Sequence, residues 1–254
     1  WRYIKKNLEM DLLEITVVQS DVTEIEADVL VVNLFEGITS PSGAAGVVDS
    51  ALGGLISELI SDGEISGSAS ELTLIHTPNS AYPNFKPSRV LVAGLGSSKG
   101  FNTDNARKIS AGVIRKLRAV GVQSAATIVH GAGIGDLDAS SSAQAVVEGA
   151  LLGAYRFLKY RTTDKQRKSD VAQFTIVESD SAKISSIQTG VDRGIAYSEA
   201  EVLARDLVNE PANKLSPADL ADTAIRVATE NGLDCTVLEE ADVTALGMGA
   251  FVGV

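Results

Sequence analysis

Cysteine, histidine and long apolar runs are all scarce in this chain of 254 residues. The single cysteine, Cys235, cannot form an internal disulfide, so the sequence fits a reducing compartment and we expect a cytoplasmic protein. Cys235 lies in an apolar run, Asp234–Leu238, that predicts a strand, and we expect its thiol to be buried and inert. Because no apolar run approaches about 18 residues, we expect no membrane span. Trp1–Glu9 also lacks the apolar stretch of a signal peptide.

Basic residues are in the minority, with 22 Lys and Arg against 33 Asp and Glu and a formal net charge of -11. A surface this acidic repels a phosphate backbone, so we expect no nucleic-acid partner. Basic residues cluster only briefly, in a helical pattern at Arg115–Arg118 and a predicted turn at Lys165–Lys168. Hydrophobic residues make up 44% and aromatics 5%, which predicts a core built mainly from aliphatic side chains.

Short β-rich runs alternate with longer helical ones in the first two thirds of the chain. The β-rich runs show little polar alternation, which is typical of strands buried on both faces of a parallel or mixed sheet. This order predicts a three-layer α/β domain in which helices flank a mixed sheet. The predicted strands are Leu12–Val18, Asp28–Leu34, Leu72–Thr77, Arg89–Leu95, Ser124–His130 and Ala172–Glu178. The predicted helices are Ala44–Ile60, Ala139–Leu158 and Thr103–Val120, the last capped by Thr103 and Gly121.

The pattern changes after Glu178, where a polar break precedes a long helical run from about Ser185 to Val208. We divide the chain into an α/β domain over residues 10–182, a linker helix over 183–208 and the beginning of a second domain over 209–254. In that second domain Ser216 and Pro217 open a helix that Asn231-Gly232 closes, and a strand at Cys235–Leu238 and a short helix at Glu239–Leu246 follow. The apolar, Gly-rich run from Gly247 to Val254 predicts an element that is interrupted.

His76 and His130 are the only histidines, and each lies at or near the end of a predicted strand. Neither has a histidine or cysteine neighbour at metal-ligand spacing, and we expect both to be hydrogen-bonded structural residues. Carboxylates are plentiful, as in Glu239-Glu240 and in Asp136 with Asp138, but paired acids on an acidic protein usually belong to a solvated surface. No residue is marked as a general base.

Two Gly-rich turns follow strands, Gly94–Gly100 and Gly131–Asp136, and could in principle approach a phosphate. Neither matches the GxGxxG spacing of dinucleotide-binding turns, and Lys99 is not followed by the Ser or Thr of a P-loop. The first turn also matches GxSxG, which would expose Ser98 as a nucleophile. His130 follows too closely for the usual order of a triad, so we interpret both segments as turns.

The segment Ala204–Pro217, with the sequence ARDLVNEPANKLSP, resembles the start of the catalytic domain of the leucyl (cytosol) aminopeptidase family. Leu246–Ala250 supports this, and so do Glu148–Phe157 and Arg89–Gly96, which resemble parts of the N-terminal domain of that family. The resemblance extends from about Met10 to the last residue.

The resemblance implies a dinuclear metallo-exopeptidase in which two divalent metals, zinc or manganese, activate a water that attacks peptide substrates. The metal-binding motifs of the family resemble GKGxxFDSGG and NTDAEGR, and neither occurs in this sequence. We therefore assign no catalytic, cofactor-binding or metal-binding residue and expect no bound metal and no activity from this portion alone. The family is usually a homohexamer, assembled largely through its catalytic domains. Asn209 and Asn213 are interpreted as turn and cap residues, the alternative being support for a catalytic site.

The N-terminal domain of the family resembles the macro domain, an ADP-ribose-binding fold, and this gives the alternative function. The matching segments are Ser20–Thr23, with Asp21, then Asp28–Asn33, then the loop Ser42–Val47. Ala44 and Ala45 replace glycines that would let the backbone approach a diphosphate, and Glu36 would add unfavourable negative charge. We expect a structural domain that governs assembly or access to the peptidase site.

Overall fold

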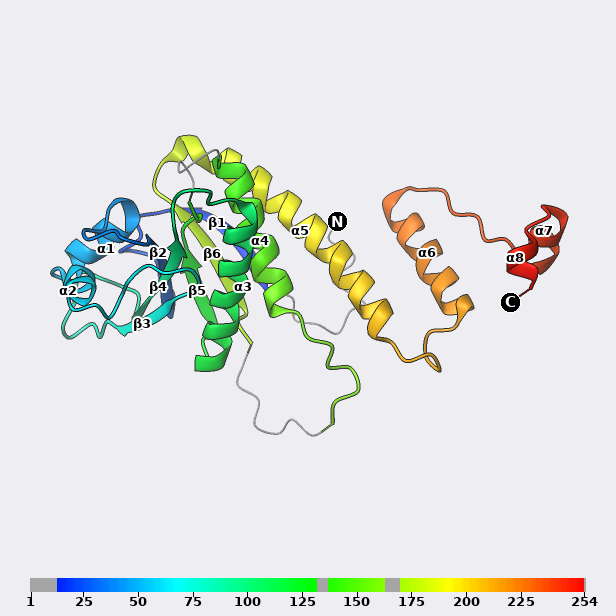
Figure 1. Ribbon diagram of the computed structural model, residues 1–254, viewed down its shortest axis with the longest axis horizontal. Helices are drawn as coiled ribbons and strands as arrows, with labels where there is room; N and C mark the ends of the chain where they lie inside the picture. Colours follow the sequence, from blue (N-terminus) through cyan, green and yellow to red (C-terminus); the bar gives the residue numbers. More distant parts are fainter. Residues whose placement is uncertain (1–12, 132–136, 163–169, 254) are drawn as a thin grey trace. The chain divides into compact units, whose positions relative to one another are not determined.

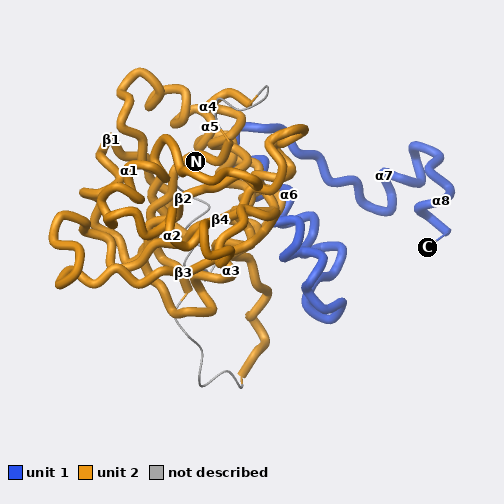
Figure 2. Tube along the Cα trace, turned by 60° about the vertical axis from the view of Figure 1, so that its left-hand side comes forward, with its two compact units in different colours: residues 1–9, 203–254 blue, residues 10–202 orange. Residues whose placement is uncertain are grey.

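The computed structural model of this protein describes residues 13–131, 137–162 and 170–253 (Figure 1). The chain forms two compact units, one from Met10 to Val202 and the other including Leu203–Val254 (Figure 2). The predicted domain boundaries at residues 182 and 208 remain predictions.

The first unit is built around a six-stranded mixed sheet in the order β1-β6-β5-β2-β4-β3. Every pair is parallel except β3 with β4, so the antiparallel strand lies at an edge. All six predicted strands form, and their apolar runs are buried because helices cover both faces. The strands are β1 (Glu14–Gln19), β2 (Val29–Phe35), β3 (Leu72–His76), β4 (Arg89–Gly96), β5 (Ser124–Thr127) and β6 (Gln173–Glu178).

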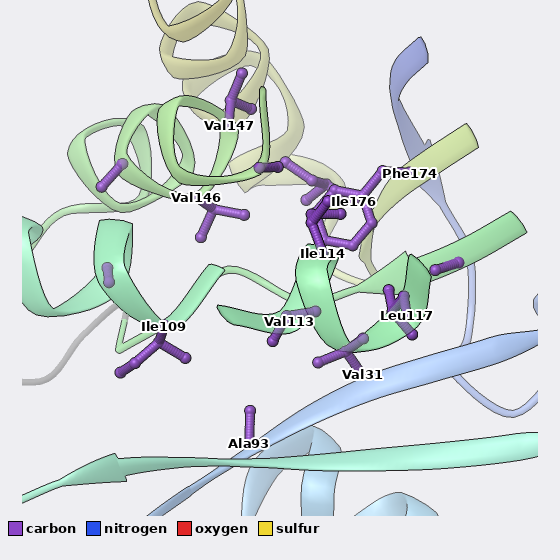
Figure 3. Close-up of a cluster of buried hydrophobic side chains, with 14 of the residues drawn as sticks. Val31, Ala93, Ile109, Val113, Ile114, Leu117, Val146, Val147, Phe174 and Ile176 are labelled. Atoms are coloured by element: carbon purple, nitrogen blue, oxygen red, sulfur yellow. The ribbon is translucent and has the colours of Figure 1, made fainter. Parts of the chain in front are cut away.

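Two hydrophobic cores lie on opposite faces of the sheet, which confirms the predicted three-layer arrangement. On one face Leu30 and Val32 of β2 pack with Val48 and Ile56 from α1 (Gly43–Ala51) and α2 (Leu55–Ser61). On the other face the core contains side chains of β2, β4 and β6 together with side chains of three helices (Figure 3). These helices are α3 (Thr103–Val120), α4 (Ala139–Ala154) and the first part of α5 (Ser181–Asn209).

The predicted helix Ala44–Ile60 is two helices, because Gly53 and Gly54 both adopt positive φ angles, 69° and 88°. That left-handed conformation ends α1 and starts α2 in a new direction. Among the described residues no single helix has the length and apolarity to cross a membrane. α1 and α2 meet those criteria only as a pair, across a bend of 105°.

The N-cap of α3 is Asn102, so the prediction of Thr103 was wrong by one residue. The Asn102 side chain accepts hydrogen bonds from the amides of Asp104 and Asn105, at 3.0 and 3.1 Å. The Asn105 side chain accepts the Asn102 amide in return, at 3.1 Å, which completes a capping box. Gly121 ends the helix with φ 78°, as predicted.

Helices α3, α4 and α5 approach one another through glycines. A β-carbon added to Gly149 of α4 would lie 2.2 Å from the backbone oxygen of Arg107 in α3. One added to Gly190 of α5 would lie 2.0 Å from the backbone oxygen of Ser140 in α4. Arg107 also forms an ion pair with the buried Glu148 of α4, with 2.5 Å between its Nε and the carboxylate. These contacts fix the register of the three helices.

In the second unit α6 (Pro217–Asn231) begins at Ser216 and ends at Gly232, as predicted. Two short helices follow, α7 (Glu240–Ala245) and α8 (Gly249–Val252). The predicted strand at Cys235–Leu238 does not form, and Cys235 is exposed rather than buried. No described residue between 203 and 253 belongs to a strand. The segment Cys235–Leu238 therefore has no neighbouring strand within 203–253 with which to form backbone hydrogen bonds.

Candidate functional site

The carboxyl ends of the parallel strands form the candidate site of the first unit. Open α/β sheets bind ligands outside the carboxyl ends of their strands, because the connecting turns gather there. The turns after β2, β4 and β5 meet at this edge, and they carry most of the polar and glycine residues that the sequence singled out.

Asn33 lies near the end of β2 and is half-buried. Its Nδ2 donates a long hydrogen bond, 3.4 Å, to the carbonyl of Val129, just beyond β5. Its Oδ1 is buried and accepts no hydrogen bond from the described residues. A buried acceptor without a donor is uncommon in folded proteins, so Asn33 is the first polar group of interest at this edge.

His130 follows β5 and is fully buried. Neither ring nitrogen has a hydrogen-bond partner among the residues that the structure describes, which differs from the predicted hydrogen-bonded histidine. Burial lowers the pKa of the imidazole from 6.5 to about 4, so the ring is neutral at neutral pH. The backbone is held in place by the Ser142 hydroxyl, which donates to the His130 carbonyl at 2.5 Å.

The two histidines cannot form one site. His76 is exposed and pairs with Arg89, the first residue of β4. It therefore lies at the amino end of the parallel strands, whereas His130 follows the carboxyl end of β5. Within the described ranges no three His, Cys, Asp or Glu side chains lie close enough together to hold a metal ion.

The turn Gly94–Gly100 is a structural connection. The amide of Gly94 donates to the Glu71 carbonyl and that of Gly96 to the Gly67 carbonyl, both at 2.8 Å, so neither points toward a ligand. Ser98 is exposed, and the imidazole of His130 makes no hydrogen bond to it. The GxSxG match is therefore not part of a triad.

Only the first residue of the second Gly-rich turn can be described, since residues 132–136, including Asp136, lie outside the described ranges. Gly131 has φ 71°, and a β-carbon there would lie 2.4 Å from the ring of Phe101. That ring packs edge-on against Phe35, with 5.2 Å between centroids. A side chain at position 131 would collide with Phe101, so the contact between Gly131 and this ring requires glycine.

Three other carboxylates that the sequence pattern indicated lie at the starts of helices. Asp138 is the N-cap of α4, and hydrogen bonds from the Ser141 amide and hydroxyl, at 2.8 and 2.9 Å, lower the pKa of its carboxyl. Glu239 and Glu240 are exposed at the start of α7. Asn209 is the last residue of α5 and Asn213 lies in the following turn; their support for a catalytic site remains untested.

The residues that a macro-domain ligand site would use mostly make contacts within the protein itself. The Asp21 carboxylate accepts hydrogen bonds from the Thr23 amide and hydroxyl, at 2.8 and 2.7 Å, which lower its pKa. Ala45 is a residue of α1, and its side chain is buried in the core between this helix and the sheet. Glu36 lies just beyond β2 and accepts a 3.4 Å hydrogen bond from Ser68.

The sequence analysis missed the loop Ser66–Glu71, which packs on the ends of β2 and β4. The Glu71 carboxylate accepts hydrogen bonds from three successive backbone amides, those of Ser66, Gly67 and Ser68. Successive amides of this kind form an anion-binding concavity, or nest. The signal was available as Ser-Gly-Ser followed by an acidic residue, although that pattern is common in turns.

Two family models match this chain in succession. The model described as the N-terminal domain of the cytosol aminopeptidase family matches residues 31–164, and the model of its catalytic domain matches residues 202–254. The first match covers β2 to α4, and the second begins near the end of α5.

Curated relatives resemble the chain over most of its length. A protein of Alkaliphilus metalliredigens, named probable cytosol aminopeptidase, is 32% identical over 243 residues, which are 95% of this chain and 48% of the relative. A probable cytosol aminopeptidase of Solibacter usitatus is 35% identical over 242 residues, 95% of this chain and 45% of the relative. The chain therefore spans about half the length of the curated relatives that it matches.

Solved structures show the same fold. The bottromycin maturation enzyme BotP in complex with Mn has a TM-score of 0.64 and 28% identity, covering 87% of this chain and 40% of that one. A variant of tomato leucine aminopeptidase has a TM-score of 0.75 and 20% identity, covering 92% and 46%. A Trypanosoma brucei macrodomain in complex with ADP has a TM-score of 0.52 and 14% identity, covering 70% and 68%. The last two likenesses concern the fold alone.

Proposed function

Because this chain belongs to the cytosol aminopeptidase family, we propose that it is the N-terminal part of a dinuclear metallo-aminopeptidase that releases N-terminal amino acids such as leucine from peptides. The observation that carries the proposal is the order of the two matches, an N-terminal domain at residues 31–164 and a catalytic domain from residue 202. A macro-like domain standing alone would not continue into a peptidase segment.

The exposed apolar residues support this assignment. Among the described residues, nine of the thirteen large hydrophobic side chains that are exposed lie at or beyond Val208, including Leu246 at 64% and Phe251 at 70%. In residues 203–253 the only buried hydrophobic side chain is that of Ala228. So little burial does not stabilise a fold, and we infer that the remainder of a catalytic domain covers this surface.

The described residues do not fit a dinuclear metal centre. Such a centre needs several carboxylate, imidazole or thiolate ligands directed at one point, and no group of three is present in the described parts of this chain. We therefore assign no step of peptide hydrolysis to the described residues. The manganese complex of BotP supports manganese as one metal of the complete enzyme, and zinc is the alternative.

We assign a structural role to the first unit, which would govern assembly of the complete protein or access to its peptidase site. Its two hydrophobic cores and its central strands, each paired on both sides, are those of a rigid scaffold. The complete protein would act on peptides in the cytoplasm as a homo-oligomer, in the hexameric form that the family resemblance implies. The boundaries proposed for the two domains and their linker are residues 10–182, 183–208 and 209–254.

ADP-ribose or nucleotide binding is the second candidate for the first unit. The fold resembles that of a macrodomain solved with ADP, and Asn33 offers an unpaired buried oxygen at the carboxyl edge of the sheet. Three observations argue against nucleotide binding. The Asp21 carboxylate already accepts hydrogen bonds from Thr23, Ala45 is buried, and Glu36 is negatively charged. A nucleotide-binding domain would gain thermal stability on addition of ADP-ribose, and the gain would increase with the logarithm of the ligand concentration above its Kd.

Hydrolysis of a leucine-derived chromogenic amide with added manganese tests the proposal. We expect activity from the longer gene product and none from the 254-residue chain, because the family metal motifs do not occur in the latter. Thermal shift with ADP-ribose is measured on the same preparations. Absence of activity in both proteins, together with stabilisation by ADP-ribose, would overturn the aminopeptidase assignment and favour the second candidate.

A further inference from the structure

An internal carboxylate fills a backbone nest at the carboxyl edge of the sheet. Glu71 Oε2 accepts hydrogen bonds from the amides of Gly67 at 2.7 Å, Ser66 at 3.0 Å and Ser68 at 3.2 Å. The Ser66 hydroxyl adds a fourth donor to the same oxygen at 3.0 Å. Four donors on one charged oxygen form a strong, directional anion site.

The nest is held rigidly against the sheet. Gly67 has φ 74°, and a β-carbon there would lie 2.5 Å from the carbonyl oxygen of Phe35 at the end of β2. The Gly67 carbonyl accepts the Gly96 amide at the end of β4, at 2.8 Å. Because β2 and β4 anchor the loop from below, we expect the three amides to keep their directions when the carboxylate leaves.

The site is also accessible. Ser66 is exposed, Ser68 and Glu71 are half-buried and Gly67 is buried, so we expect a small solute to approach the nest from the side of Ser66. The Ser68 hydroxyl donates to Glu36 Oε1 at 3.4 Å, which places a second carboxylate beside the nest. That charge opposes dianions such as phosphate more strongly than it opposes a monoanion.

We propose that residues 66–68 are a binding site for a small monocarboxylate, which Glu71 occupies as an internal ligand and which an external carboxylate enters by displacing Glu71. The ligand carboxylate would take the position of Glu71 Oε2 and receive the same three amides and one hydroxyl. The site belongs to the first unit and does not depend on the proposed peptidase function.

Chemical rescue of Glu71→Ala by acetate tests the proposal. The variant removes the internal ligand, and we expect a lower Tm that acetate raises by about 3 °C at about four times its Kd, whereas chloride at equal ionic strength does not. The matched control is Glu64→Ala, which removes a nearby exposed carboxylate that does not accept the hydrogen bonds of the Ser66, Gly67 and Ser68 amides. We expect acetate to leave the Tm of this control unchanged.

Amide chemical shifts locate the binding. Acetate should shift the Ser66, Gly67 and Ser68 amides of Glu71→Ala, and should shift those of the original chain only at concentrations about tenfold higher, because the tethered carboxylate competes. Glu71→Gln provides a folded, uncharged variant if the alanine variant does not fold, and its Gly67 amide should respond to acetate at an intermediate concentration. If acetate leaves the chemical shifts of these amides unchanged in every folded variant, the proposed site is refuted. Tighter binding of phosphate than of acetate would overturn the assignment to carboxylates.

Discussion

At the residue scale, two polar side chains at the carboxyl edge of the sheet have buried atoms without a hydrogen-bond partner in the described part of the chain. His130 and Asn33 both lie there with ring or amide atoms that have no partner among the described residues. Asp21 and Asp138, by contrast, accept hydrogen bonds from the second or third residue after them. Local pairing of this kind stabilises turns and helix caps.

His130 makes stability dependent on pH. Its pKa is about 4 in the folded protein and near 6.5 in the unfolded chain, so only the unfolded state binds a proton between those values. The free energy of unfolding is therefore unaffected by His130 above about pH 6.5 and decreases as pH falls toward 4, by about 3 kcal/mol in total. Urea unfolding followed by circular dichroism at pH 7, 5.5 and 4.5 measures this loss.

The substitution His130→Leu isolates the contribution of the imidazole to the pH dependence of stability, because leucine fills a similar volume and does not titrate. We expect the difference in stability between this variant and the original chain to change with pH over that window. The control His76→Leu alters an exposed histidine at the other edge of the sheet and should follow the original chain. Parallel pH profiles for His130→Leu and the original chain would show that the imidazole is not kept neutral by the fold.

At the scale of the elements, close helix packing depends on glycines that propensity alone would not favour. Gly149→Ala introduces a β-carbon 2.2 Å from the backbone of α3, so α3 and α4 must separate. We expect a loss of about 1–3 kcal/mol in the free energy of unfolding, measured by urea titration.

The matched control lies in the facing helix. Gly112 of α3 has only the Leu72 side chain near its added β-carbon, at 3.8 Å. Gly112→Ala should therefore raise stability by about 1 kcal/mol through helix propensity. Equal effects of the two substitutions would contradict the packing argument.

The sequence predicted the elements better than their junctions. The six strands and the helix Thr103–Val120 follow from apolar patterning, because patterning reports burial directly. Gly53-Gly54 breaks one predicted helix, and Asn102 rather than Thr103 caps another, because several residues in each segment offer suitable local chemistry. The strand expected at Cys235–Leu238 requires a neighbouring strand, which no local pattern reveals.

The candidate site was less predictable than the fold. His130 and Asn33 could be identified as polar residues at strand ends, but the absence of hydrogen-bond partners depends on side chains from other elements. The Glu71 nest depends on the φ angle of Gly67 and on contacts with β2 and β4, which a short Ser-Gly-Ser sequence does not specify.

At the scale of the whole molecule, the two units differ in what stabilises them. The unit from Met10 to Val202 has two cores around a six-stranded sheet, whereas the described part of the other unit exposes most of its large apolar side chains. This contrast agrees with the match of residues 202–254 to only part of a catalytic domain in relatives about twice as long. We infer that a folded scaffold precedes the opening segment of a peptidase domain.

Hydrogen exchange, compared between this chain and the longer gene product, tests that claim most directly. We expect the amides of β2 and β4 to be protected in both proteins, because their core is complete. The amides of α6 (Pro217–Asn231) should exchange rapidly in the 254-residue chain and be protected in the longer protein, where the remaining catalytic domain would cover them. Equal protection of α6 in both proteins would contradict the account, since it would show that this segment folds without the rest of a peptidase domain.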